Sequence, residues 1–333
     1  MDFCESELWN SNLTWYTDTP QFTECFQSTV LVYTPAGVLV VTSIMDIYNY
    51  IHSRLRTIPW SVCLITKMVL TAVCLLLAVI ELSSSISDLL SAKTIFMEDL
   101  VAPLVKIFSY CLSLTLIIIS KHFGQVYSPA QFIFWCSNLL CQGLVLFSLS
   151  ENTYDDINFL NLVLLILNIV TNIIMFFLNC FADKQPLYAD LMDQVEENPC
   201  PKKFASFPSR VIFAWFDQLM LAGWKNPLTL KDLWNLNPED KLSDIVPALE
   251  KHLYKNSEDK QVSIMSTLFR CYWKAFVLLT ILYIIKSLLQ LANPQIINLF
   301  ISFLDEDQEN WKGYLYMIMF GVVSFGYEQF LGS

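Results

Sequence analysis

The stretch NFLNLVLLILNIVTNIIMFFLNCF, residues 158–181, contains no charged side chain. A helix needs about 20 apolar residues to cross the roughly 30 Å hydrocarbon core of a bilayer. Strands of membrane barrels are shorter, about 10 residues, and alternate in polarity, which this run does not. Because backbone polar groups inside lipid must bond to one another, the run is predicted to be a transmembrane helix.

Six further apolar runs extend this interpretation to the whole chain. Hydrophobic residues make up 55% of the 333 residues and charged residues only 15%, against about 25% charged residues in soluble domains. The sequence therefore predicts an all-α polytopic membrane protein with seven spans in a five-plus-two arrangement. The spans are expected near residues 30–48, 62–81, 101–120, 131–149, 158–181, 272–302 and 314–331.

Charge and cysteine content exclude several classes of function. The net charge of −11 argues against a nucleic-acid partner, because neutralising phosphates requires clustered Lys and Arg, and the 20 present are dispersed. No pair of the ten cysteines forms a C-x-x-C motif, so most are interpreted as small hydrophobic residues in or beside the spans. We predict no metal site and no catalytic residue.

The short loops predict an extracellular N-terminus. Loops rich in Lys and Arg remain in the cytosol, and Arg54, Arg56 and Lys121 lie in alternate loops. Residues 1–29 would then form an extracellular tail and residues 182–271 a cytosolic linker. The loops expected outside carry the acidic residues Asp88, Glu98, Asp99, Glu151, Asp155, Asp156, Asp305, Glu306, Asp307 and Glu309.

The N-terminal tail contains two features that suit an extracellular location. Asn12, Leu13 and Thr14 form a sequon for N-glycosylation. Cys4 and Cys25 lie in the same tail and either form a disulfide in an oxidising compartment or remain two free thiols.

Residues 204–224 of the linker are aromatic and apolar but too short and too interrupted to span a bilayer. They are predicted to lie in the headgroup layer with Trp and Phe directed inward. The alternative is a soluble amphipathic helix packed on the membrane domain, and a further helix is expected near 244–254. The residues expected to carry the membrane contact are Phe207, Arg210, Phe213, Trp215, Phe216 and Trp224.

Eight short elements, in this order and spacing, resemble the multidrug-resistance-associated proteins, the C-subfamily of ABC exporters. Each element is weak by itself, and together they extend over the whole chain. They are Pro20 to Val32, Asn198 to Pro201, Ala205 to Phe207, Ser209 with Arg210, Pro227 with Leu228, Asp232 to Trp234, Pro294 to Ile296, and Trp311 to Tyr314.

The resemblance implies a domain organisation. Residues 30–181 would form a five-helix accessory membrane domain, residues 182–271 a cytosolic linker with a membrane-associated lasso, and residues 272–333 the first two helices of an ABC transmembrane domain that is cut short. The remaining transmembrane and nucleotide-binding domains would be partners. The intact relative would be a transport ATPase that uses ATP and Mg²⁺ to export amphipathic organic anions, including glutathione conjugates.

The chain departs from such a transporter in one respect. It has no G-x-x-x-x-G-K-[ST] phosphate loop, so it is expected to bind no ATP and no cofactor by itself, and its status as an enzyme stays open. It is expected to be either a fragment of a gene product or a truncated product. We expect it in the plasma membrane, with a vacuolar or other organelle membrane as the alternative.

Lys286 is the strongest candidate for substrate binding. It lies midway along the sixth span, where a lone cation costs at least about 2.5–3.5 kcal/mol, so it should face a cavity or the bundle interior. The related exporters carry their substrate-binding lysine about one turn away, at the position of Tyr283. Pro294 is expected to kink the same helix beside the substrate path. The alternative role of Lys286 is to pair with a structural acid.

The other polar residues of the spans receive structural interpretations. Asp46, Lys67, Lys106 and Lys274 lie near span ends and are predicted to reach the headgroup layer. Asn138 and Gln142 are predicted to hydrogen-bond a neighbouring helix, and Glu328 is a further buried-charge candidate.

Two other functions fit parts of the pattern. A seven-helix receptor has the same number of spans, but span three ends in Ser120-Lys121-His122-Phe123 and span seven lacks Asn-Pro-x-x-Tyr. A free-standing scaffold or trafficking domain fits residues 30–181, which are expected to contain no buried charge and no obvious cavity.

Overall fold

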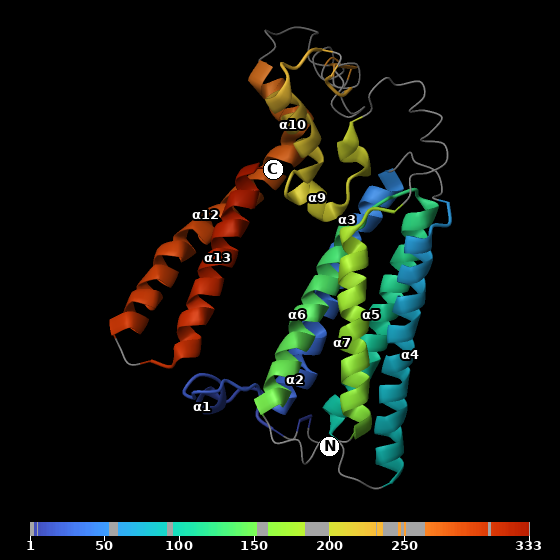
Figure 1. The fold of residues 1–333 in the computed structure, drawn as a ribbon, viewed down its shortest axis with the longest axis vertical. Helices are drawn as coiled ribbons and strands as arrows, with labels where there is room; N and C mark the ends of the chain where they lie inside the picture. The colour runs from blue at the N-terminus through green and yellow to red at the C-terminus, as the bar shows by residue number, and fades with distance from the viewer. Residues whose placement is uncertain are drawn as a thin grey trace. The chain divides into compact units, whose positions relative to one another are not determined.

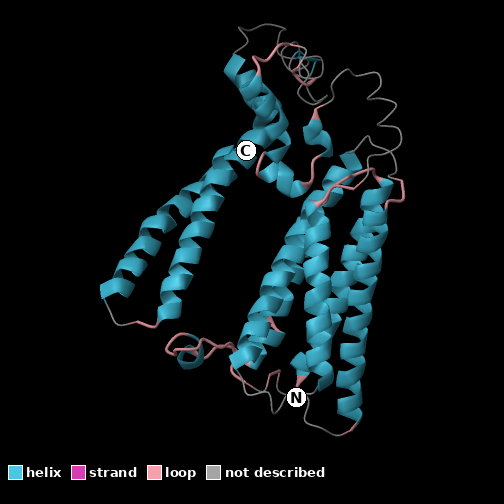
Figure 2. Ribbon diagram, in the orientation of Figure 1, coloured by secondary structure: helices cyan, strands magenta, loops and turns pink. Residues whose placement is uncertain are grey.

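The computed structural model describes most of the chain as helices joined by short loops, and its described part contains no strand (Figure 2). The all-α polytopic fold class is therefore confirmed. Several sequence interpretations fall on residues outside the described part, among them Arg54, Arg56, Asp155 and Asp156, and most of the helix expected near 244–254. The described residues are 3–4, 6–52, 59–91, 96–151, 159–183, 200–230, 232–235, 246–247, 250, 264–305 and 308–332.

The chain divides into two compact units. One unit comprises Met1–Glu197 with Phe204–Trp224, and the other comprises Asn198–Lys203 with Lys225–Ser333. The first unit thus contains the predicted accessory domain together with the aromatic segment of the linker, residues 204–224, called the lasso segment below. The four-part division of the chain drawn from the sequence stays a prediction.

Five long helices form the bundle of the first unit (Figure 1). The helices α3 and α6 pack along each other, as do α4 and α5, and α7 packs on both α4 and α6. Aromatic residues fill the centre, where Trp135 stacks on Tyr110 with a 6.0 Å distance between ring centroids. The five helices are α3 (Val30–His52), α4 (Val62–Leu90), α5 (Met97–His122), α6 (Pro129–Glu151) and α7 (Phe159–Cys180).

The N-terminal tail lies at one end of the bundle, called the tail end below (Figure 1). It contains α1 (Ser11–Thr14) and α2 (Glu24–Ser28). The side chain of Thr23 accepts a hydrogen bond from the amide of Phe26 and so caps α2. Short helices therefore lead directly into the first span.

The lasso segment begins at the last residue of the 3-10 turn η2 (Pro201–Phe204). It contains α9 (Phe207–Val211), η3 (Ala214–Phe216) and all but the last residue of α10 (Asp217–Lys225). Pro208 occupies the first turn of α9, where a missing amide costs no hydrogen bond. Between α9 and η3, Phe213 adopts a left-handed backbone conformation with φ of 57°. This reversal breaks the segment into short helices instead of one continuous amphipathic helix.

The second unit contains α12 (Ile264–Asp305) and α13 (Asn310–Gly332), which pack on each other as a hairpin. The described backbone of α12 departs from helical angles at Tyr272, with φ of −112° and ψ of 17°. Pro294 lies inside the helical run farther along. The side chain of Glu328 lies outside the described part, so its predicted role stays a prediction.

Within the described residues, six helical segments are long and apolar enough to span a membrane. The helix α13 also forms at the place of the seventh predicted span, but the side chains of residues 327–332 lie outside the described part, so that span stays a prediction. The chain is an integral membrane protein. The six segments are Glu24–Tyr48, Val62–Leu90, Met97–His122, Pro129–Leu149, Leu162–Cys180 and Phe276–Asp305.

Candidate functional site

The lasso segment docks on the bundle through α9. The ring of Phe207 lies 5.5 Å from the ring of Phe132 on α6, measured between centroids, and α9 also packs on α7. The Arg210 guanidinium donates a hydrogen bond to the Tyr127 hydroxyl and lies 4.0 Å from the centroid of its ring. One aromatic contact and one cationic contact therefore hold α9 at this end of the bundle, called the lasso end below.

Three of the six residues between α5 and α6, Val126 to Ser128, connect the lasso segment with α3 and with the residues that follow α7. The carbonyl of Val126 accepts a hydrogen bond at 3.1 Å from the amide of Asp183, which follows α7. Tyr127 contacts Arg210, and the hydroxyl of Ser128 donates to the carboxylate of Asp46 on α3. A single loop thus couples α3, α7 and the lasso segment.

Asp46 is an interior anchor and does not reach the headgroup layer, which corrects the prediction from the sequence. Its side chain is only 1% exposed and accepts hydrogen bonds from Ser128, from the amide of Ala130 at 3.3 Å and from the Tyr50 hydroxyl at 3.2 Å. Buried carboxylates persist when several donors replace the lost water. The sequence could not show Ser128 and Ala130 as donors because they lie 82 and 84 positions away.

Lys67 likewise points inward instead of reaching headgroups. Its ammonium lies 3.0 Å from the carboxylate of Asp183, and the two side chains are 7% and 9% exposed. Lys106 forms a two-oxygen ion pair with Glu81, at 2.7 and 2.9 Å. Only Lys274, which is exposed on α12, keeps the predicted surface position.

The remaining aromatic residues of the lasso segment are mostly exposed. Phe213 and Trp224 are 44% and 83% exposed, and Trp215 and Phe216 pack edge to face at 5.7 Å between centroids. Exposed Trp and Phe on a segment docked to a membrane bundle suit the headgroup layer. The packing of α9 on the bundle agrees with the second interpretation, and the location of the exposed aromatic residues in the headgroup layer stays a prediction.

A chain of amide side chains crosses the middle of the bundle. Asn138 on α6 donates to Asn172 on α7 at 2.9 Å, and Asn172 donates to Gln142 at 2.7 Å. Tyr110 on α5 donates to Asn168 at 3.3 Å. The prediction that Asn138 and Gln142 bond a neighbouring helix is confirmed.

The bundle also contains a cavity of about 520 Å³, contrary to the expectation of no obvious cavity. It is lined by residues of α2 and of all five long helices, including Glu81, Lys106 and Tyr110. The buried carboxylate of Asp46 and the Lys67 ion pair equally contradict the expectation of no buried charge. Interior charge was missed because each partner is distant in sequence.

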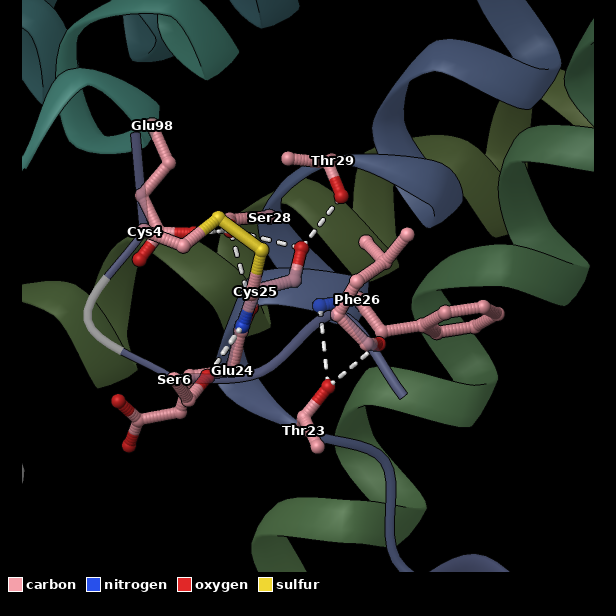
Figure 3. The surroundings of a disulfide bond; sticks show 10 residues. Cys4, Ser6, Thr23, Glu24, Cys25, Phe26, Ser28, Thr29 and Glu98 are labelled. Atoms are coloured by element: carbon pink, nitrogen blue, oxygen red, sulfur yellow. Dashed lines mark hydrogen bonds between the residues drawn. A yellow bond between two sulfur atoms is a disulfide. The ribbon is translucent and has the colours of Figure 1, made fainter. Parts of the chain in front are cut away.

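The tail end is held together by a disulfide between Cys4 and Cys25, with the Cα atoms 5.6 Å apart (Figure 3). The hydroxyl of Ser28 donates to the Glu98 carboxylate at 2.6 Å, and the Glu98 amide donates to the carbonyl of Phe3 at 3.1 Å. Glu98 also lies near the two sulfur atoms. Cysteines joined in a disulfide are not thiolate ligands, so this group is not interpreted as a metal site.

The other candidate site residues predicted from the sequence lie on α12 and on α1. Lys286 is half-buried on α12, with its ammonium 5.9 Å from the centroid of the Tyr283 ring, and Tyr283 is 66% exposed. Asn12 is exposed on α1, accessible for the predicted glycosylation, which stays a prediction. Pro294 lies on the same helix as Lys286, so these candidates share one element and do not form an enclosed site within the described residues.

Comparison with known proteins matches residues 2–163 to the ABC transporter TMD0 domain. The chain is 26% identical to mouse (Mus musculus) ATP-binding cassette sub-family C member 3, over 93% of this chain and 22% of the relative. The rat (Rattus norvegicus) member 3 is 29% identical, over 73% and 16% respectively. Human (Homo sapiens) sub-family C member 2 is 23% identical, over 95% and 23%. The chain spans less than a quarter of the length of these relatives.

Proposed function

We propose that this chain, which matches the ABC transporter TMD0 domain and is similar to C-subfamily ABC transporters, is the N-terminal part of an ATP-driven exporter of that subfamily. The exported compounds are amphipathic organic anions and conjugates such as glutathione conjugates. The protein lies in the plasma membrane with its N-terminus outside. ATP and Mg²⁺ bind to nucleotide-binding domains beyond this chain, and the similarity to ABC transporters argues against the receptor alternative.

The docking of α9 on the bundle carries this proposal. Phe207 and Arg210 attach the linker to the Phe132 and Tyr127 side chains of the accessory domain. A linker fixed in this way attaches the accessory domain to the segment that leads to the transport helices. The role proposed for the bundle is therefore to position the linker, whereas the substrate path belongs to the helices that follow.

Within this exporter, Lys286 and Tyr283 form part of the contact with anionic substrate. The ammonium and the ring lie on the same face of α12, three residues apart, and an ammonium with neighbouring aromatic surface suits an amphipathic anion. Pro294 lies farther along the same helix. The family resemblance supports a basic residue in this region, and the cation found here is Lys286.

The transport proposal is tested with full-length protein in inside-out membrane vesicles. ATP-dependent uptake of a glutathione conjugate is expected in the unmodified protein. Lys286→Leu should lower uptake about tenfold, because a hydrogen bond to a charged group contributes about 1.5–3 kcal/mol. Lys274→Leu, which removes an exposed cation from the same helix, is the matched control and should retain uptake.

Two results would contradict the proposal at different levels. Absence of ATP-dependent uptake of any organic anion by the unmodified protein would refute the exporter function. Normal uptake by Lys286→Leu would refute only the assignment of the anion contact.

A scaffold or trafficking role for the accessory domain is the second candidate. It is favoured because the bundle and the lasso segment form one compact unit that does not include α12 and α13. Deleting residues 1–181 while keeping the linker separates the two roles. Loss of surface delivery with normal uptake per delivered molecule supports trafficking, whereas loss of uptake by correctly delivered protein supports a direct role in transport.

A further inference from the structure

We propose that the cavity inside the five-helix bundle binds an amphipathic monocation, a molecule with one amine on an apolar body. Its volume of about 520 Å³ lies within the roughly 300–1,000 Å³ typical of small-molecule sites. The site is separate from the anion path proposed for α12. It gives the accessory domain a ligand of its own, of opposite charge to the exported compounds.

The lining of the cavity changes from charged to apolar along the bundle. Glu24 on α2 and Asp99 on α5 line it at the tail end. Leu77, Phe134 and Leu165 line it on α4, α6 and α7. A charged head at the tail end and an apolar body extending toward the middle therefore match the lining.

The charge expected on the ligand's polar group follows from the charges of the residues that line the cavity. Lys106 is the one cationic side chain among the lining residues, and both oxygens of Glu81 accept hydrogen bonds from its ammonium. That pair is neutral as a unit, and the lining contains three further carboxylates, Glu24, Asp88 and Asp99, so its net charge is negative. Side chains of one charge sign around a cavity raise the local concentration of the opposite charge, so this lining attracts an ammonium and repels a carboxylate or sulfonate.

The deep part of the cavity requires no polar group from the ligand. Asn138, Gln142 and Asn168 line it, but they already bond to one another, to Tyr110 or to Asn172. An apolar body can therefore fill this part without leaving those amides unpaired. A ligand that is polar along its whole length would not make this apolar contact.

The α2 wall of the cavity is held at three points. The amide of Gln27 donates to the Ser148 hydroxyl on α6 at 3.0 Å, and Ser28 donates to Glu98 on α5 at 2.6 Å. The Cys4–Cys25 disulfide ties the preceding chain to the same helix (Figure 3). These bonds fix Glu24 and its neighbours as a formed wall, which lowers the entropy cost of binding.

The test is equilibrium binding to the full chain in phosphatidylcholine nanodiscs. The probe is a fluorescent long-chain alkylamine, and the comparison probes are an alkylsulfonate and an alcohol with the same chain and fluorophore. The amine should bind saturably and the other two should not. The Glu24→Gln/Asp99→Asn double variant should weaken amine binding roughly tenfold, since it removes two of the three lining carboxylates outside the Lys106–Glu81 pair while keeping side-chain size.

Two control variants separate the site from general effects. Asp18→Asn removes an exposed carboxylate of the tail outside the cavity lining and should bind the amine normally. Leu165→Trp fills the apolar part and should also abolish saturable binding. Thermal melting in the same nanodiscs shows which variants are folded, and only folded variants enter the comparison.

Competition identifies the source of the amine. Displacement of the probe by a sphingoid base added to the bilayer indicates a membrane lipid, and displacement by a soluble amphipathic amine indicates a ligand from water. Failure of both to compete would overturn the proposal, as would equal binding of the sulfonate or unchanged binding by the folded double variant. None of these measurements depends on transport, so the binding site could be supported even if the exporter function were refuted.

Discussion

The five-helix bundle and the α12–α13 hairpin are both apolar and helical, but they bury their surfaces very differently. In the most apolar 18 residues of each bundle span, between 22% and 39% are buried, whereas none are buried in the most apolar 18 residues of the span Phe276–Asp305 of α12. The bundle therefore covers much of its own surface. The hairpin presents apolar side chains on most of its faces, as expected for helices that pack with further helices or with lipid.

Polar residues show the same difference. In the bundle they bond between helices, as Asn138 does with Asn172 and Lys106 with Glu81. In the hairpin the described hydroxyls bond within their own helix, where Ser287 donates to the carbonyl of Tyr283 at 2.9 Å. Stability of the bundle should thus depend on particular interhelical pairs, and stability of the hairpin should not.

The largest expected effect comes from breaking the buried ion pair of the bundle. Lys67→Met leaves the carboxylate of Asp183 buried without its cation, which should cost about 3–5 kcal/mol. Reversible unfolding of the full chain in detergent measures the loss. The Lys67→Met/Asp183→Leu double variant should recover part of the lost stability. A Lys67→Met variant as stable as the unmodified chain would contradict the expected difference between the bundle and the hairpin.

A smaller effect is expected from the amide chain. Asn172→Leu removes the partner of both Asn138 and Gln142 and should cost about 1–2 kcal/mol, in the range measured for hydrogen bonds between membrane helices. Ser287→Ala in the hairpin is the matched control and should change the unfolding free energy little. Equal losses in the two variants would show that interhelical bonding does not distinguish the regions.

The smallest effect concerns an ion pair between Glu309 and Lys312, near the start of α13. A hydrogen bond from the Lys312 ammonium, at 2.7 Å, holds the pKa of the Glu309 carboxyl below its usual value. The stabilisation is present above the usual carboxyl pKa and is lost as pH falls through the lowered value. The melting temperature of Glu309→Gln should therefore be slightly below that of the unmodified chain at neutral pH and equal to it in strong acid. Glu7→Gln is the control, and a difference that grows toward acid would contradict the assignment.

The spans were predictable because hydrophobicity is a local property of the sequence. The run at 158–181 places α7 at Phe159–Cys180 without any knowledge of its neighbours. Helix ends were predicted less well, and α4 continues to Leu90 through Ser83, Ser84 and Ser85. Serines can remain helical there because their hydroxyls bond back to carbonyls of the preceding turn, as Ser85 does to Glu81.

Pairings between distant residues were not predictable from local pattern. Lys67 and Asp183 are 116 positions apart, and Asp46 finds its donors 82 and 84 positions away. A charge near the end of a span looks the same in the sequence whether it turns toward headgroups or toward a partner. The cavity was missed for the same reason, because its wall is assembled from six helices.

The disulfide at the tail end also bears on the order in which the protein is made. Cysteines pair in oxidising compartments, so under the proposed orientation Cys4 and Cys25 join only after the tail has crossed the membrane. The oxidation state of this one cysteine pair would therefore report whether the tail has crossed the membrane, and alkylation of free thiols would measure it.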